Sequence, residues 1–550
     1  MLPCSQADAI AFLARGGDPA AKTEILETHI SRIFLTGDRA FKMKRAVKLP
    51  YLDFSTPELR LAACRKEVEF NAPTAPGLYI GVRRITRDTN GRVVFDGSGM
   101  LVDAVVEMTR FNQSLLLDRM ADACTLTPGL MAQTACMIAH FHNQAPVVHA
   151  GEGAANLAAV LDINKAGFAT SHVFSREEVN SLDASFRRAL VRHANTLNER
   201  ETVGKIRRCH GDLHLRNICL FDGQPRLFDC IEFNDQIATV DVLYDLSFLL
   251  MDLWHRGLPH LANLTANRYL DETENEDGFV LLSFLMAVRA AVRAHVTATQ
   301  IEEDGDPSGD LSAQARSYFD LARHLLREHP AQLIAIGGLS GSGKTTVAEA
   351  LATGVGGAPG ARIVESDRIR KAMHGVSAET RLPEKAYRPE ISELVYREIA
   401  WRSGLILAEG GAVIADAVFD RPADRQRIEQ VAHERNRPFL GIWLDVSPDV
   451  LWRRVEQRRG GPSDATVDIL SRQLQKDLGK VGWRRIDAAR KPTTIVSDIL
   501  SMAVDRIHTE TGDGSIAHSK LKRRMDRETA GNAQPAPCRT TSTPSARYKS

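Results

Sequence analysis

The segment that most constrains this chain is a glycine-rich run in the second half of its 550 residues. It reads Gly338-Leu339-Ser340-Gly341-Ser342-Gly343-Lys344-Thr345-Thr346, and the apolar residues Leu333 to Ile336 come directly before it. The segment TTVAEALATG overlaps the end of the run and predicts a helix. A strand, this loop and a helix in that order form a P-loop, which binds phosphate through backbone amides. The sequence therefore predicts an α/β domain with a parallel sheet.

The P-loop also supplies side chains for nucleotide chemistry. Lys344 is expected to act catalytically by neutralising the β- and γ-phosphates of ATP, and Thr345 to ligate Mg²⁺. The predicted nucleotide-binding residues are Gly338, Ser340, Gly341, Ser342, Gly343, Lys344, Thr345 and Thr346.

Polar residues follow two further strands of this α/β segment. Asp367 comes at a strand end with Arg370 one helical turn later, which suits a catalytic carboxylate facing an acceptor and a guanidinium holding an anionic group. Asp416 ends the apolar run AVIAD and is predicted to act on magnesium as a Walker-B-like carboxylate.

An arginine-rich helix is expected after the next strand. Arg458 and Arg459 adjoin the sequence GGPSDA and are interpreted as part of a lid that covers the transferring phosphate, with Arg458 catalytic. For Arg453 and Arg454 a solvated helix face is an equal alternative.

A second set of phosphate-handling residues lies about 120 residues earlier. The segment Cys209-His210-Gly211-Asp212-Leu213-His214-Leu215-Arg216-Asn217 is followed by Leu227-Phe228-Asp229. Asp212 is predicted to orient and deprotonate a hydroxyl, while Asn217 and Asp229 hold Mg²⁺ against ATP. His210 and His214 are interpreted mainly as hydrogen-bonding braces of this loop.

The N-terminal region supplies partners for this second set. Two strand-type runs flank Thr36-Gly37-Asp38, which predicts a hairpin that presents Lys42. The helix PELRLAACRKEVEFNA offers Glu67 as the ion-pair partner of Lys42, with Glu69 as the alternative. A later strand is expected to end at Glu107-Met108, where a hinge would offer backbone groups to adenine.

These residues resemble a known family. The pattern His210-Gly211-Asp212-Leu213-His214-x-x-Asn217, with Phe228-Asp229-x-x-Glu232, is similar to the aminoglycoside phosphotransferase group of the protein-kinase-like fold. The resemblance covers about residues 25 to 325 and implies a two-lobed fold that moves the γ-phosphate of ATP to a hydroxyl of a small molecule. Asp241 and Asp245 match acidic positions of the family. The chain departs from the kinase pattern because no glycine-rich loop precedes Lys42.

The P-loop segment carries a resemblance of its own. About residues 331 to 508 resemble small P-loop kinases, including gluconate, shikimate and chloramphenicol kinases and the kinase domain of polynucleotide kinases. The whole chain resembles bacterial bifunctional proteins that fuse an aminoglycoside phosphotransferase-like part to a P-loop ATP-binding part.

Composition sets the remaining expectations. The net charge is +1, from 70 Lys and Arg against 69 Asp and Glu, which indicates no general binding to nucleic acid or to a membrane surface. The 8 Cys show no Cys-x-x-Cys pair and no signal peptide is recognised, so a cytoplasmic protein is predicted. The apolar stretch from Phe279 contains Arg289 and Arg293 and is interpreted as a buried core helix. The predicted domains are a kinase-like α+β domain over 1–328, a P-loop kinase over 329–508 and a disordered tail over 509–550.

The sequence thus favours an ATP- and Mg²⁺-dependent phosphotransferase with two nucleotide sites and a small-molecule hydroxyl acceptor. Two alternatives stay open at this point: a polynucleotide 5′-hydroxyl kinase in the C-terminal domain, and a non-catalytic regulatory protein that binds ATP. The sequence specifies neither the acceptor nor the oligomeric state.

Overall fold

The structure is a computed structural model that describes residues 6–15, 23–49, 52–149, 151, 153–457 and 461–511. Its contacts divide the chain into two compact units. The first, unit 1, holds residues 1–121, 125–160 and 197–252, and the second, unit 2, holds residues 122–124, 161–196 and 253–550. Unit 2 therefore includes residues 253–328 together with the P-loop segment, whereas the sequence places a domain boundary at 328/329.

Unit 1 begins with a mainly β region and continues into helices and short hairpins; α3, α5, α6 and α8 contribute residues to both units. Its elements are α1 (Gln6–Ala14), β1 (Glu24–Glu27), β2 (Ser31–Thr36), β3 (Arg39–Lys44), β4 (Lys48–Leu49), β5 (Leu52–Asp53), α2 (Pro57–Asn71), β6 (Tyr79–Arg87), β7 (Val93–Phe95), β8 (Met100–Thr109), η1 (Gln113–Leu115), α3 (Leu117–Asp122), α4 (Pro128–Gln144), α5 (Gly153–Ala169), α6 (Arg176–Thr202), β9 (Ile206–Arg208), η2 (Leu215–Asn217), β10 (Ile218–Phe221), β11 (Gln224–Leu227), α7 (Asp235–Ala238), β12 (Thr239–Asp241) and α8 (Val242–His255).

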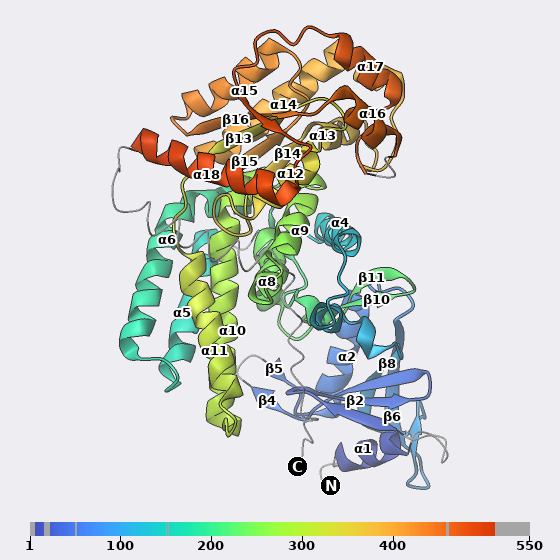
Figure 1. Ribbon diagram of the computed structural model, residues 1–550. Helices are drawn as coiled ribbons and strands as arrows, with labels where there is room; N and C mark the ends of the chain where they lie inside the picture. The colour runs from blue at the N-terminus through green and yellow to red at the C-terminus, as the bar shows by residue number, and fades with distance from the viewer. Residues whose placement is uncertain are drawn as a thin grey trace. The chain divides into compact units, whose positions relative to one another are not determined.

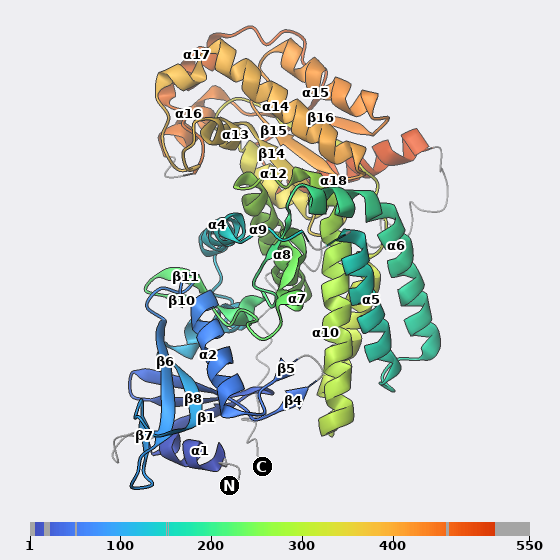
Figure 2. The ribbon, with the colours of Figure 1, turned by 180° about the vertical axis from the view of Figure 1, so that it is seen from behind.

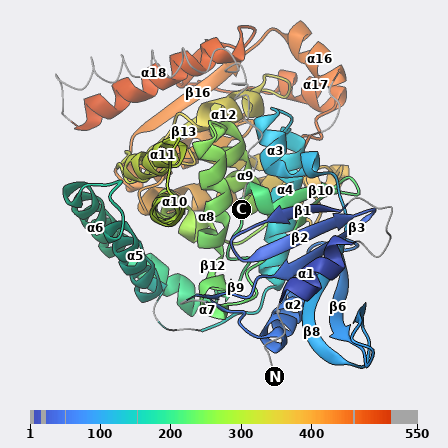
Figure 3. The ribbon, with the colours of Figure 1, turned by 90° about the horizontal axis from the view of Figure 1, so that it is seen from below.

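The main sheet of unit 1 has the strand order β1-β2-β3-β8-β6-β7 and is antiparallel at every pairing. Side chains alternate between its two faces. Ala104 and Val106 pack with Cys64 of α2, while Val105 packs on the other face with Ala9 and with other residues of α1. The sheet therefore lies between α1 and α2, and Figure 3 shows both helices beside its strands.

The predicted hairpin at Thr36-Gly37-Asp38 is confirmed, because Thr36 of β2 pairs with Arg39 of β3 and Gly37 has a positive φ of 57°. Helix α2 begins where its sequence predicts. Thr56 caps it by accepting a hydrogen bond from the amide of Leu59, and Pro57 occupies its first turn. These local signals fix the start of the helix that carries Glu67.

Unit 2 combines helices with one parallel sheet. Its elements are α9 (Pro259–Asp271), η3 (Glu276–Leu281), α10 (Leu282–Asp304), α11 (Asp310–Leu325), β13 (Leu333–Gly337), α12 (Lys344–Ala352), β14 (Arg362–Glu365), α13 (Ser366–Met373), η4 (Glu384–Tyr387), α14 (Pro389–Ala408), β15 (Val413–Asp416), α15 (Pro422–Glu434), β16 (Phe439–Asp445), α16 (Pro448–Glu456), α17 (Val467–Gln475), β17 (Arg484–Asp487) and α18 (Pro492–Thr511).

The sheet of unit 2 has the order β14-β15-β13-β16-β17, and all its pairings are parallel. The three inner strands β15, β13 and β16 are nearly continuous apolar runs because both faces are covered, whereas the edge strands β14 and β17 carry charged residues. Val347 of α12 and Ile499 of α18 pack with Ile334 and Ile414 in the main core of one face. Helices α14 and α15 cover the other face, as Figures 1 and 2 show from opposite sides. The predicted α/β fold with a parallel sheet is confirmed.

The apolar stretch Glu276–Glu303 is long and apolar enough to cross a membrane by length and composition, yet 72% of its apolar window is buried inside the fold. A core helix has the same properties, as the sequence predicts for this stretch. Helix α18 extends to Thr511, so it reaches the first residues of the predicted tail, and the rest of that tail lies outside the described residues.

Candidate functional sites

The first site forms around Lys42 on β3 of unit 1. Lys42 Nζ lies 2.7 Å from Glu67 Oε1 and also contacts the carboxylate of Asp229. Lys42 and Glu67 are buried, whereas Glu69 is exposed. The structure thus brings Lys42, Glu67 and Asp229 together, and the buried face of α2 selects Glu67 over Glu69.

A second lysine, which the sequence interpretation did not assign, joins this cluster. Lys44 Nζ lies 2.6 Å from Glu67 Oε2 and contacts Glu232. Side chains alternate along β3, so Lys44 points to the same face as Lys42. The sequence signal was present in this alternation and in the Phe228-Asp229-x-x-Glu232 spacing, but only the fold shows that the two residues meet.

The charges of the two lysines influence whether the carboxyl groups of this cluster are ionised. Burial opposes ionisation of Asp229, but Lys42 and Lys44 outweigh it and hold the pKa of Asp229 below its ordinary value. Burial likewise opposes ionisation of Glu67, and the same two lysines lower its pKa. Both carboxyl groups are therefore anions that can face a cation or a phosphate-bound metal.

Asp245 of α8 holds the backbone of the loop that carries Asp212. Asp245 accepts hydrogen bonds from the amides of Gly211 at 2.8 Å and His210 at 3.1 Å, and it lies 3.1 Å from His142 Nε2. Asn217 Nδ2 donates to Asp212 Oδ2 at 2.9 Å. The loop therefore holds Asp212 and Asn217 side by side, as the predicted roles require.

The two histidines of the loop have different neighbours. His210 is fully buried, its Nε2 lies 2.9 Å from the carbonyl oxygen of Phe228, and burial lowers its pKa. His210 therefore braces the loop, in agreement with its interpretation from the sequence. His214 Nε2 instead lies 3.3 Å from Asp212 Oδ2.

The adenine side of this site differs in detail from the sequence expectation. Glu107 and Met108 lie within β8 and pair with Phe41 and Ala40 of β3, and the strand continues to Thr109. Arg83 forms an ion pair with Glu107 at 3.1 Å. The hinge at Glu107-Met108 remains a prediction. In place of a glycine-rich loop, a short turn over residues 28–30 joins β1 to β2.

The second site is the P-loop of unit 2, where β13 leads through the loop into α12 as predicted. Thr345 Oγ1 donates to Asp416 Oδ2 at 2.7 Å, and Lys344 Nζ donates to the carbonyl oxygen of Leu339 at 3.2 Å. Gly338 has a φ of 146°, and a Cβ there would lie 2.7 Å from Ser342 Oγ. The loop requires glycine at this position to turn this tightly.

Three carboxyl groups gather at the strand ends beside the P-loop, of which Glu365 and Asp416 are buried and Asp367 is partly buried. Glu365 of β14 lies opposite Asp416 of β15, and Asp367 follows on α13. Burial raises the pKa of Asp416 to about 6, and burial together with Asp416 raises the pKa of Glu365 to about 8. Burial also raises the pKa of Asp367. The sequence interpretation missed Glu365, although it directly precedes Ser366-Asp367.

A cluster of polar and aromatic side chains lies next to Asp367. Arg370 is buried, donates to the carbonyl oxygen of Ala386 at 2.8 Å and lies over the ring of Tyr387 at 4.7 Å. Asp464 accepts hydrogen bonds from Tyr387 at 2.6 Å and from Lys371 at 2.8 Å. Residues on α13, η4 and the segment after residue 460 therefore converge here.

The predicted lid arginines fall into three groups. Arg454 donates to the carbonyl oxygens of Gly341 and Ser342, both at 3.4 Å, so it lies against the P-loop. Arg453 is exposed. Arg458 and Arg459 lie outside the described residues, and their roles stay predictions.

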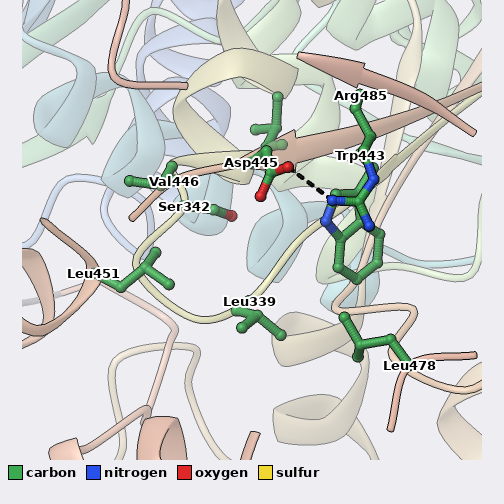
Figure 4. A pocket seen from close by; sticks show the side chains of 9 residues that line it. Leu339, Ser342, Trp443, Asp445, Val446, Leu451, Leu478 and Arg485 are labelled. Carbon is green, nitrogen blue, oxygen red and sulfur yellow. Dashed lines mark hydrogen bonds and ion pairs between the residues drawn. The ribbon is translucent and has the colours of Figure 1, made fainter. Parts of the chain in front are cut away.

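A small cavity of about 80 Å³ lies beside the P-loop. Arg485 and Asp445, which form an ion pair at 2.8 Å, line it together with Ser342 (Figure 4). The other lining residues are Leu339, Trp443, Leu444, Val446, Leu451 and Leu478. This volume suits a few water molecules and is too small for a nucleotide.

Both sites contain oxygen-bearing side chains that could hold Mg²⁺ together with a nucleotide. In unit 1 these are the amide of Asn217 and the carboxylate of Asp229, and in unit 2 the hydroxyl of Thr345 and the carboxylate of Asp416. Hard oxygen ligands of this kind, few in number, are typical of Mg²⁺ bound together with phosphates.

Comparisons with known proteins agree with this architecture. Residues 333–477 match a family model described as an AAA domain. The chain is 28% identical over 479 residues to the uncharacterized protein Rv2004c of Mycobacterium tuberculosis, in an alignment covering 85% of this chain and 92% of the relative. The uncharacterized protein Mb2027c of Mycobacterium bovis matches with the same identity and coverage. An alignment of this extent spans both predicted domains, so these relatives share their combination.

Similar solved structures match one part of the chain each. A choline/ethanolamine kinase family protein from Mesorhizobium loti is 16% identical, with 58% of this chain and 95% of that chain covered and a TM-score of 0.38. A gluconokinase from Sinorhizobium meliloti is 24% identical, with 34% and 100% covered and a TM-score of 0.24.

Unit 1 thus has the antiparallel sheet and the Lys42–Glu67 ion pair that its resemblance to the protein-kinase-like fold predicts, and unit 2 has the predicted P-loop beside a parallel sheet, within the AAA-domain match. The family match and the two sites support ATP-dependent phosphotransfer.

Proposed function

We propose that the protein is a phosphotransferase with two ATP sites, each of which moves the γ-phosphate of Mg²⁺-ATP to a hydroxyl group of a small molecule. In each reaction the acceptor oxygen forms a bond to the γ-phosphorus, and the bond from that phosphorus to the bridging oxygen of ADP breaks. The hydroxyl proton passes to a carboxylate of the protein.

In unit 1 the proton acceptor is Asp212. Asn217 donates to it and so fixes the direction of its carboxylate. Lys42, aimed by Glu67, binds the α- and β-phosphates, and Asn217 and Asp229 hold the metal. Bound Mg²⁺ neutralises charge that develops on the phosphate oxygens.

In unit 2 the proton acceptor is Asp367. Burial raises its pKa, which brings a carboxyl group closer to the value at which it accepts a proton near neutral pH. Lys344 and the loop amides bind the phosphates, while Thr345 and Asp416 hold the metal. Arg370 lies one turn from Asp367 and offers a buried guanidinium to an anionic group of the acceptor.

One observation carries this proposal: each unit contains its own lysine, its own oxygen ligands and its own candidate base. The two sets form separate sites, because Lys42 pairs with Glu67 within unit 1 and Thr345 pairs with Asp416 within unit 2. We therefore expect two separable activities.

The test is a screen of a metabolite pool for ATP-dependent phosphorylation by the full chain. Asp212→Asn should lower one activity at least about a hundredfold, since it removes a general base. Lys344→Ala should abolish a different one. Asp222→Asn, in the exposed β10–β11 turn, and the exposed Lys480→Ala are matched controls that should retain both activities. Survival of both activities in the Asp212→Asn/Lys344→Ala double variant would refute the proposal.

The screen includes arms for the alternatives. Label transferred to a 5′-hydroxyl oligonucleotide, lost on Lys344→Ala, would instead identify a polynucleotide kinase in the C-terminal domain. Tight ATP binding with no phosphorylated acceptor in any arm would indicate a regulatory protein.

A further inference from the structure

The edge of the P-loop sheet is covered by a helix from outside the P-loop segment. Among the described strands β14 pairs only with β15, so its other edge needs hydrogen-bonding partners. Helix α9 supplies them. Asn263 and Asn267 donate to the carbonyl oxygen of Ala361 at 3.0 and 3.3 Å, and Asn267 accepts from the amide of Ile363 at 2.7 Å. These amide side chains satisfy backbone groups that a neighbouring strand would otherwise pair.

The same contact contains a buried cluster of charges. Asp271, the last residue of α9, lies 2.8 Å from Arg362 and 3.5 Å from Arg368. Glu276 of η3 lies 2.9 Å from Arg362 and 2.8 Å from Arg402. Arg362 is only 1% exposed. Buried charges of this kind are stable only when paired, so each acid constrains the arginines around it.

The cluster continues into the P-loop site. Arg368 lies 3.2 Å from Glu365, and Glu365 lies opposite Asp416 in the sheet. Burial raises the pKa of Asp271, whereas Arg362, Arg368 and Arg268 lower it. The arginines have the larger effect and hold this pKa below its ordinary value. Asp271 at the end of α9 is thus connected through Arg368 to Glu365, which lies beside the P-loop.

We infer that Asp271 is a positioning residue for the P-loop site, because it holds Arg362 and Arg368 and thereby fixes β14 and α13, which carry Glu365 and Asp367. The inference rests on the proposed function of this site. It also means that the site depends on α9, which the sequence assigns to the kinase-like domain. Figures 1 and 2 show α9 beside α12 from both sides.

The position of this contact determines which step it affects. The phosphate-binding loop lies between β13 and α12, whereas the candidate base Asp367 lies on α13. A shift of β14 and α13 would misplace Asp367 and leave the P-loop amides in place. Misplacing a reacting group by about 1 Å can cost about a hundredfold in rate. Asp271 should therefore affect turnover more than affinity for the nucleotide.

The experiment compares Asp271→Asn with its parent in the full chain, both carrying Asp212→Asn so that ATP turnover reports the P-loop site. Asparagine keeps the shape and removes the charge. Arg362 keeps Glu276 as a partner and Arg368 keeps Glu365, so the variant should fold. Asp320→Asn, which removes an exposed acid 3.9 Å from Arg323, is the matched control.

We expect Asp271→Asn to lower Lys344-dependent ATP turnover at least about tenfold while the Kd for Mg²⁺-ATP changes less than about twofold. Asp271→Glu should restore part of the rate, and Asp320→Asn should resemble the parent. Unchanged turnover would overturn the inference. A joint loss of turnover, affinity and thermal stability would also overturn it, because it would mean a general structural role.

Hydrogen exchange gives a readout that does not need turnover. Asp271→Asn should speed exchange of amides in residues 362–371 relative to residues 333–337, and unchanged exchange would overturn the inference. If the parent shows no Lys344-dependent turnover, the proposed function fails at this site, and the exchange result still decides whether Asp271 holds β14 and α13.

Discussion

The buried pair of Lys44 and Glu232 gives the sharpest prediction about unit 1. Both side chains are almost fully buried, and Lys44 contacts Glu67 as well as Glu232. Lys44→Met removes the cation that touches Glu232, while Glu67 keeps Lys42. Breaking a buried ion pair on one side typically costs about 3–5 kcal/mol, because the remaining charge is left without compensation.

Removing both partners should cost much less than removing one. In Lys44→Met/Glu232→Leu no uncompensated charge stays at this position, and apolar groups of similar size occupy the space. Such replacements are often neutral or stabilising. We expect the double variant to unfold within about 2 kcal/mol of the parent. Lys48→Met, which removes an exposed lysine 2.9 Å from Asp53, is the control and should cost at most about 1 kcal/mol.

The distribution of tryptophan makes the assay specific. All 5 Trp lie between residues 254 and 483, which belong to unit 2; Trp254 lies on α8, which both units share, and the other four lie in the P-loop segment, so their fluorescence reports mainly unit 2. Far-UV circular dichroism reports both units. In urea, Lys44→Met should lower the midpoint of the unit 1 transition by about 1–2 M, from a slope of about 2–3 kcal/mol per molar. The fluorescence midpoint should stay in place.

The effect also depends on pH in a defined direction. Burial raises the pKa of Glu232 and Lys44 opposes that rise, so Lys44→Met should raise this pKa further. A carboxyl group whose pKa is higher in the folded state than in the unfolded state lowers the free energy of unfolding as pH rises. At low pH, where the group is protonated in both states, this loss disappears. The penalty should therefore be larger at pH 8 than at pH 5. A penalty below about 1 kcal/mol at pH 8, or a double variant as unstable as the single one, would refute this reasoning.

Three further predictions concern unit 2. Asp416→Asn removes the carboxylate bound by Thr345 and should weaken Mg²⁺-dependent ATP binding at least about tenfold, with metal-free ATP binding unchanged in calorimetry. Gly441→Ala places a Cβ 2.5 Å from Trp483 and should destabilise unit 2 by about 1–3 kcal/mol. The fluorescence midpoint should therefore move to lower urea, and an unchanged midpoint would contradict this close contact between Gly441 and Trp483. Burial lowers the pKa of His295 to about 4, so its ring is neutral in both states above pH 6.5, and the fold loses up to about 3 kcal/mol of stability as pH falls toward 4; His295→Leu should flatten that dependence.

The parts of the sites that the sequence predicted are those with local causes. The P-loop needs glycines and a strand-loop-helix order within a few residues, and the structure shows this order. Asp212 and Asn217 lie five residues apart in one loop, so their proximity is also local. Lys42 and Glu67 were paired by strand alternation and helix periodicity, and the choice over Glu69 required knowledge of which face of α2 is buried.

The parts that were missed depend on contacts between distant residues. Glu232 is 188 residues from Lys44, and Asp271 is 91 residues from Arg362; no local pattern connects either pair. Glu365 looks like an ordinary strand-end residue until the parallel register places it opposite Asp416. The strand that carries Glu107 and Met108 ends at Thr109, one residue later than the sequence predicts, because the end of a strand depends on its pairing with neighbouring strands.

The sequence by itself determined the two kinds of fold and most of the candidate phosphate-binding residues, because backbone conformation, hydrogen-bonding groups and side-chain periodicity are local properties. Only the tertiary structure decided which charges are buried together and which helix covers the edge of β14. Burial and long-range pairing set the protonation of carboxyl groups such as Asp416 and Glu365, since desolvation depends on everything packed around a group.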